Sequence, residues 1–138
     1  MRKKDTSKIE EEILSFFPVL REKKHKKAYT LSGGERQMLA IASVLLLEPK
    51  LLILDEPSAG LAPILVQKLY KNIVEIAETG IKIIMAEQNV RASLEISDKC
   101  LVLVSGKKVA EGDSRSILCR EDLGKIFLGK TKVNQVQD

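Results

Sequence analysis

Two short stretches of this sequence carry the residue types that phosphate chemistry needs. The first is Leu31-Ser32-Gly33-Gly34-Glu35-Arg36-Gln37, in which two glycines open an expected helix. Glycines at a helix start let an anion approach the backbone amides, and the helix dipole favours negative charge there. The second stretch is Leu51-Leu52-Ile53-Leu54-Asp55-Glu56-Pro57, an apolar run that ends in two carboxylates. One carboxylate could hold Mg²⁺ and its neighbour could polarise a water for attack on a phosphate.

Each stretch also has an ordinary interpretation when it is taken alone. Two glycines before a helix are most often just a turn, and a strand that ends in Asp-Glu can simply be solvated. The functional interpretation gains weight from the full seven residues of the first stretch. It gains more because a single predicted helix joins Ser32 to the strand that ends at Asp55.

The elements that must position these residues alternate between helix and strand. Ser32 and Glu35 have the spacing of a capping box, which stabilises a helix start by about 1 kcal/mol. The continuous apolar runs 51–54 and 81–86 predict strands of a parallel sheet buried on both faces. The order therefore predicts an α/β fold, with helices over 8–17, 32–47, 63–79, 90–96, 115–119 and 121–128, strands over 51–54, 81–86 and 100–104, and a hairpin partner over 108–111.

Composition fits one ordinary globular domain of 138 residues, with 44% hydrophobic and 30% charged residues. The net charge of +4 comes from residues 1–30, centred on Lys23-Lys24-His25-Lys26-Lys27. That basic run could face nucleic acid or anionic lipid, but no aromatic residue is interleaved with it, so a solvated loop is favoured and no nucleic-acid partner is expected.

The same sequence argues against secretion and against a membrane span. Cys100 and Cys119 have no metal-ligand spacing, and reduced thiols of a cytosolic protein are the default. The longest apolar stretch, 39–47, is far short of the about 20 residues that cross a bilayer. The charged N-terminus does not resemble a signal peptide. We therefore expect a cytoplasmic chain whose membrane contact needs a partner.

With these motifs in place, the chain resembles the C-terminal half of the ATP-binding subunits of ABC transporters. Residues 31–37 are similar to the signature motif and 51–56 to the Walker B strand. Ser58-Ala59-Gly60-Leu61 is similar to the D-loop, and Ala86-Glu87-Gln88-Asn89 falls where the family has its switch. Gln88, where most members carry His, together with Gly60-Leu61-Ala62-Pro63, resembles the branched-chain amino acid importer type.

The resemblance implies a partial P-loop NTPase fold over 1–129, a mostly parallel sheet with flanking helices. Within it, 1–50 would be a helical region with the signature, and 51–129 would hold Walker B, D-loop, switch and C-terminal part. A polar tail would follow over 130–138. The implied cofactors are ATP and Mg²⁺, and the implied partners are a second ATPase subunit and transmembrane permease subunits. The implied location is the cytoplasmic face of the cell membrane, where the chain would be peripheral.

The resemblance also assigns roles to individual residues. Ser32, Gly33, Gly34, Glu35 and Gln37 would contact a partner's ATP, and the D-loop residues Ser58, Ala59, Gly60 and Leu61 would contact the opposite subunit. Asp55 would hold Mg²⁺, while Glu56 and Gln88 would be catalytic. An amide does not titrate near neutrality as imidazole does, and the one histidine, His25, precedes the signature. Glu56 is therefore the best candidate for activating or orienting water.

A P-loop in a workable context is missing from the sequence. The string Gly-x4-Gly-Lys-Thr does occur from Gly124 to Thr131, but the pattern needs a buried strand before it and a helix after it. Only a short polar stretch follows, so we interpret the match as coincidence. No glycine precedes Leu31. We therefore expect a gene fragment, a truncated reading frame or half of a split subunit, with weak or no ATP binding by the chain alone.

One further expectation concerns self-association, and three identities for the chain remain open. Without a P-loop strand beside it, 81–86 would present a hydrophobic edge, which favours self-association. The chain could be an importer ATPase subunit or part of one. It could instead be a catalytically incomplete fragment that contributes only the signature surface to a partner ATPase. A third possibility is an ABC-type ATPase outside transport, although the long heptad runs typical of those proteins are absent.

Overall fold

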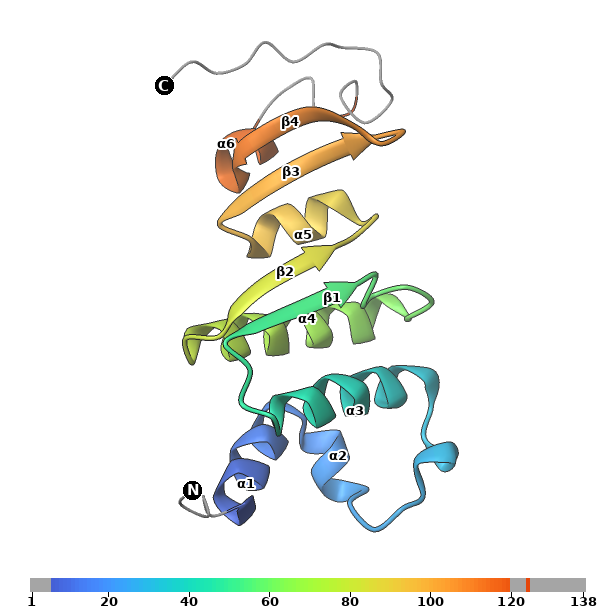
Figure 1. Ribbon diagram of the computed structural model, residues 1–138. Coiled ribbons are helices and arrows are strands. Elements are labelled where there is room, and N and C mark those ends of the chain that lie inside the picture. Colours follow the sequence, from blue (N-terminus) through green and yellow to red (C-terminus); the bar gives the residue numbers. More distant parts are fainter. Residues whose placement is uncertain (1–5, 120–123, 125–138) are drawn as a thin grey trace. The chain divides into compact units, whose positions relative to one another are not determined.

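A computed structural model describes residues 6–119 and residue 124 (Figure 1). The described chain divides into two compact units between Glu87 and Gln88. The expected helix over 121–128, the tail over 130–138 and most of the Gly124–Thr131 string lie outside the described residues. The elements are α1 (Thr6–Phe16), α2 (Pro18–Glu22), the 3-10 helix η1 (Ala28–Thr30), α3 (Gly33–Leu45), β1 (Leu51–Asp55), α4 (Pro63–Glu78), β2 (Lys82–Ala86), α5 (Val90–Ile96), β3 (Lys99–Val104), β4 (Lys107–Asp113) and α6 (Ser114–Leu118).

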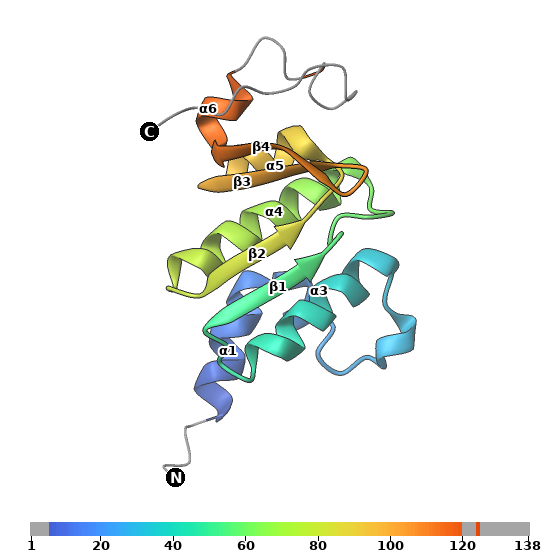
Figure 2. The same cartoon turned by 45° about the horizontal axis from the view of Figure 1, so that its top comes forward.

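The first unit is built on two parallel strands, β1 and β2. They pair in register from Leu51 opposite Lys82 to Asp55 opposite Ala86. Helix α4 runs alongside both strands (Figures 1 and 2). One face of the sheet is covered, since Leu52 and Leu54 are buried, as is the apolar face of α4 with Leu69, Tyr70, Ile73 and Ile76. The parallel pair places the ends of β1 and β2 side by side, which is where ligands bind in open α/β sheets.

The other face of this sheet is open, which corrects the expectation of strands buried on both faces. The side chains of Leu51, Ile53 and Ile84 are 47%, 68% and 56% exposed. Side chains alternate between the two faces of a strand, so all three lie on the face opposite Leu52 and Leu54. The apolar runs therefore carry more hydrophobic surface than the described helices of this unit cover.

Three helices precede the sheet in the same unit, and they pack around Phe17. That side chain is fully buried, with Ile13, Leu20, Met38 and Ile41 also buried. Pro18 stands at the first position of α2, where its missing amide costs nothing. Helix α3 ends at Leu45, two residues earlier than expected, because Glu48 turns the chain with a φ of +49°.

The second unit contains the expected hairpin. Strands β3 and β4 pair antiparallel, with a register shift after Val102. Its core is small, with Leu94, Val102, Ala110 and Ile117 buried together. The α/β class with parallel strands and flanking helices is confirmed. The proposed domain bounds at residues 50 and 129 stay a prediction.

Candidate functional site

The turn that begins α3, residues Leu31–Arg36, is held by its own side chains. We call it the signature turn. Glu35 N donates to Ser32 Oγ at 3.4 Å, and Ser32 N donates to Glu35 Oε2 at 3.0 Å, so the capping box is confirmed. Arg36 Nη1 adds a 2.6 Å bond to the carbonyl of Leu31. A helix cannot supply acceptors for its first amides, which here belong to Gly33 and Gly34.

A lysine from the basic loop also supports this turn. Lys23 Nζ lies 2.5 Å from Glu35 Oε1, and the Glu35 side chain is only 16% exposed. The hydrogen bond from Lys23, followed by that from the Ser32 amide, lowers the pKa of Glu35 below its usual value. Glu35 therefore stays ionised and keeps both contacts near neutral pH. The sequence did not indicate this use of Lys23.

The two glycines of the turn have different surroundings. Gly33 is exposed, and a Cβ built on it would meet nothing within 4 Å. A Cβ at Gly34 would lie 3.0 Å from Leu65 Cδ1 and 3.4 Å from Leu61 Cδ2. A side chain at Gly34 would therefore crowd Leu65 of α4, and the D-loop residue Leu61 lies next to the same position. The structure thus brings the signature turn and the D-loop together within one unit.

The end of β1 places its two carboxylates differently. Asp55 is the last residue of the strand and is exposed on the open face. Glu56 N continues the ladder by donating to the carbonyl of Ala86 at 2.9 Å. Glu56 then takes a φ of +44°, which non-glycine residues adopt rarely and at a cost of about 1–3 kcal/mol. Backbone strain of this kind is concentrated at functional sites, and here it turns Glu56 away from the direction of the strand.

The D-loop, Ser58–Leu61, is held at its first residue by Glu87. Ser58 N and Ser58 Oγ each donate to the Glu87 carboxylate at 2.9 Å, and Tyr70 OH donates to Ser58 Oγ at 3.3 Å. Tyr70 is 5% exposed, and burial raises the pKa of its hydroxyl. The sequence placed Glu87 in the stretch similar to the switch, but it did not indicate that Glu87 and Tyr70 hold the D-loop. The signal for Glu87 was its place just after β2, which in a parallel pair lies beside the end of β1.

Two further predicted site residues are Gln88 and Gln37. Gln88 is exposed and is the first residue of the second unit, where its carbonyl accepts the amide of Val90 at 2.9 Å. Gln37 lies on α3, partly exposed. The role of Gln88 beside Glu56 stays a prediction.

The residues that are present fit the expected cofactors. Mg²⁺ is commonly held by one or two carboxylates together with phosphate oxygens and waters, and the exposed Asp55 supplies such a carboxylate. The exposed helix start at Gly33 suits a phosphate group. Within residues 6–119 and 124, no three His, Cys, Asp or Glu side chains gather as a complete metal cage.

A helix capped by Ser32 and opened by two glycines, a parallel strand that ends in Asp-Glu and a D-loop are the combination found in ABC-type ATPases. Residues 3–59 match the ABC transporter family model. The resemblance expected from the motifs is thereby confirmed: the chain carries the sequence pattern of ABC transporter ATP-binding proteins.

Curated relatives agree with this family. The chain is 39% identical to the high-affinity branched-chain amino acid transport ATP-binding protein BraG of Pseudomonas aeruginosa, over 86% of this chain and 51% of BraG. It is 41% identical to the probable branched-chain amino acid transport ATP-binding protein LivF of Archaeoglobus fulgidus, over 84% of this chain and 50% of LivF. The lipopolysaccharide export ATP-binding protein LptB of Haemophilus influenzae is 34% identical over 72% of this chain. The chain spans about half the length of these relatives.

Solved structures show the same fold. The ADP conformation of MJ1267, an ATP-binding cassette of an ABC transporter, superposes with a TM-score of 0.76 at 27% identity, covering 94% of this chain and 52% of that one. The partial ABC ATPase fold is therefore confirmed. No helix in the described part of the chain is long and apolar enough to cross a bilayer.

Proposed function

We propose that this chain provides the signature turn, the Walker B carboxylates and the D-loop of an ATP-hydrolysing subunit that energises a branched-chain amino acid importer. The signature turn would contact an ATP held by a second ATPase subunit, through Ser32 and the amides of Gly33 and Gly34. Asp55 would hold Mg²⁺ and Glu56 would activate or orient water. Gln88 would hydrogen-bond the γ-phosphate.

The observation that carries the proposal is the signature turn itself. Its capping box satisfies the Ser32 and Glu35 amides internally, and Gly33 beside them is exposed. A helix start arranged in this way is a phosphate-binding device. Its contact with Leu61 through Gly34 supports a joint role with the D-loop.

The choice of substrate rests on the relatives. Identity is 39–41% over 84–86% of this chain for the branched-chain amino acid transport proteins, against 34% over 72% for LptB. We therefore propose a branched-chain amino acid importer, peripheral on the cytoplasmic side of the membrane and joined there to permease subunits. The lipopolysaccharide export function of the LptB type is the runner-up among transport roles.

A second candidate function is a contribution of the signature surface alone to a partner ATPase. It is favoured by the open sheet face with Leu51, Ile53 and Ile84. Exposed apolar strands of this kind favour association with another chain, including a second copy. In this alternative, Glu56 would have no role in hydrolysis.

The test is leucine uptake by cells that lack the gene for this chain. Wild-type chain should restore uptake and Gly33→Asp should not, because the new carboxylate would stand where the phosphate approaches. The substitution leaves folding intact, since a Cβ at Gly33 meets nothing within 4 Å. Ala40→Ser, on the exposed side of the same helix, is the matched control. Normal leucine uptake in the deletion strain would refute the importer role, and impaired lipopolysaccharide export there would favour the runner-up.

A further inference from the structure

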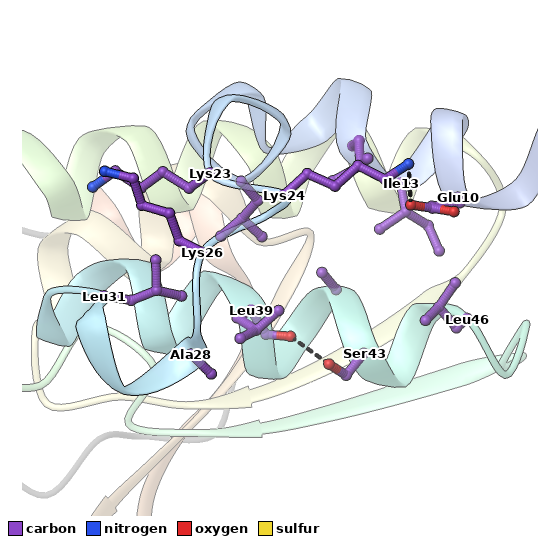
Figure 3. Close-up of a pocket in the computed structure, with 13 residues that line it drawn as sticks. Glu10, Ile13, Lys23, Lys24, Lys26, Ala28, Leu31, Leu39, Ser43 and Leu46 are labelled. Atoms are coloured by element: carbon purple, nitrogen blue, oxygen red, sulfur yellow. Dashed lines mark hydrogen bonds and ion pairs between the residues drawn. The ribbon is translucent and has the colours of Figure 1, made fainter. Parts of the chain in front are cut away.

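A cavity of about 320 Å³ lies beneath the basic loop, between helices α1, α2 and α3 of the first unit (Figure 3). Its wall is mainly aliphatic, formed by Ile13, Leu14, Leu20, Leu31, Leu39 and Leu46. The cavity is half open to solvent and its volume is at the small end of the range for ligand pockets, which are usually apolar with a few placed polar groups. None of the roles discussed above uses this cavity.

The charged groups around the cavity are unevenly arranged. Lys24 extends across one end to Glu10, with 2.7 Å between Nζ and Oε1 (Figure 3). Lys23 and Lys26 point together toward the other end (Figure 3). Lys23 shares its charge with Glu35, whereas Lys26 is an exposed lysine for which the structure gives no carboxylate contact within the described chain. This end of the cavity therefore carries excess positive charge next to aliphatic surface.

We propose that this cavity binds a small aliphatic carboxylate, with its tail against Leu39 and Leu46 and its carboxylate at Lys26 and Lys23. An ammonium pair binds a carboxylate by charge-assisted hydrogen bonds, and the aliphatic wall removes the tail from water. A cationic ligand would meet repulsion at the same end. The inference goes beyond the transport role and does not depend on ATP.

The position of the site links it to the signature turn. Leu31 lines the cavity and immediately precedes Ser32, and Lys23 is the lysine that contacts Glu35. A bound carboxylate would compete with Glu35 for Lys23. Occupancy should therefore alter the surroundings of the capping box, from Ser32 to Glu35.

The test is a titration of the isotope-labelled 138-residue chain, followed by amide NMR shifts. The probes are octanoate, octanol and octylammonium, three molecules with one tail and different head groups, used below their aggregation limits. Octanoate should give saturable shifts at cavity residues and at Ser32–Glu35, with an affinity about tenfold above that of octanol. Octylammonium should bind more weakly than octanol. Equal affinities for all three, or shifts confined to the open sheet face, would overturn the proposal.

Two variants test separately the contacts of the ligand's head group and those of its tail. Lys26→Gln should weaken octanoate binding by roughly tenfold, to the level of octanol, and should leave octanol unchanged. Lys71→Gln is the matched control, since Lys71 is a 77% exposed lysine on α4. Ser43→Leu should fill the cavity and weaken both probes. An octanoate affinity unaffected by Lys26→Gln would refute the assigned head-group site.

A final arm distinguishes a free ligand from a membrane surface. Phosphatidylcholine vesicles that contain oleate present the same carboxylate in a bilayer. Binding to these vesicles without binding to free octanoate would overturn the small-ligand site in favour of a lipid surface. Leucine uptake is measured separately, so failure of this proposal and failure of the importer role remain distinguishable.

Discussion

The signature turn and the D-loop lie in contact, yet they are held by different kinds of interaction. Within the turn, the capping bonds join Ser32 and Glu35, which are three residues apart. The D-loop begins at Ser58, whose bonds reach Glu87, 29 residues away, and Tyr70, 12 residues away. The turn is therefore built mainly by local sequence, and the D-loop by residues brought together by the fold.

This difference has consequences for stability and for function. The capping bonds of the turn are exposed, so water can replace a lost partner at modest cost. The bonds of Ser58 are part-buried, so a lost acceptor leaves donors with less access to water. The D-loop should thus depend on packing of the first unit, and the signature turn should tolerate local changes.

The prediction with the largest expected effect concerns Glu56, the carboxylate that follows β1. It tests whether this residue is needed for ATP hydrolysis. In an assembly with a P-loop-bearing subunit, Glu56→Gln should lower ATP turnover by roughly 10²–10⁴-fold, the range for a lost general base. ATP binding should be retained. Steady-state phosphate release measures the effect, and Glu48→Gln is the matched control because Glu48 also takes a positive φ. An unchanged rate would reject the role of Glu56.

The next prediction tests the long-range support of the D-loop. Glu87→Ala removes the acceptor of both Ser58 bonds and should lower the free energy of unfolding by about 1–3 kcal/mol. Tyr70→Phe removes a single, longer bond and should cost about 0.5 kcal/mol. Urea unfolding of the full chain measures both values.

A control for Glu87 is available in the same unit. Glu75→Ala removes an exposed pair with Lys71 on α4 and should change stability by less than about 0.5 kcal/mol. If Glu87→Ala were no more destabilising than Glu75→Ala, the D-loop would not depend on its distant acceptor.

A third prediction concerns the capping bonds of the signature turn, which join residues close in sequence. Ser32→Ala removes one cap of α3 and should cost about 1 kcal/mol. Ser43→Ala, on the same helix, should be close to neutral, because the Ser43 hydroxyl bonds only the carbonyl of Leu39. Urea unfolding again gives the values. If Ser32→Ala lowered the free energy of unfolding more than Glu87→Ala, the local cap would matter more for stability than the distant acceptor of the D-loop.

The same contrast explains what could be predicted from the sequence. The capping box, the strand ending in Asp55 and the hairpin of β3 and β4 depend on spacing between nearby residues, and each was expected. The contacts of Ser58 with Glu87 and of Gly34 with Leu65 depend on which elements become neighbours, and spacing does not encode that. Apolar runs predicted the strands, but not that Ile53 and Ile84 would lie on an open face.

The smallest expected effect is a change in pH dependence at the signature turn. The folded pKa of Glu35 is lowered, so its ionised form stabilises the fold above the ordinary value of 4.5, and this contribution is lost as pH falls through the lowered pKa. Glu35→Gln should therefore be less stable than wild type at pH 7, with the difference shrinking at acid pH.

The cause of that shift can be separated by titration of the Glu35 carboxyl in two variants. Lys23→Gln removes the largest contribution and should raise the Glu35 pKa more than Ser32→Ala does, because Ser32→Ala keeps the backbone amide that donates to Glu35. The carboxyl carbon signal in NMR follows each titration directly. The opposite order would mean that the turn is held by the cap alone. If both variants raised the Glu35 pKa equally, the side chains of Lys23 and Ser32 would contribute equally to lowering it. The expected order would make Lys23 of the basic loop the main support of the Glu35 carboxylate.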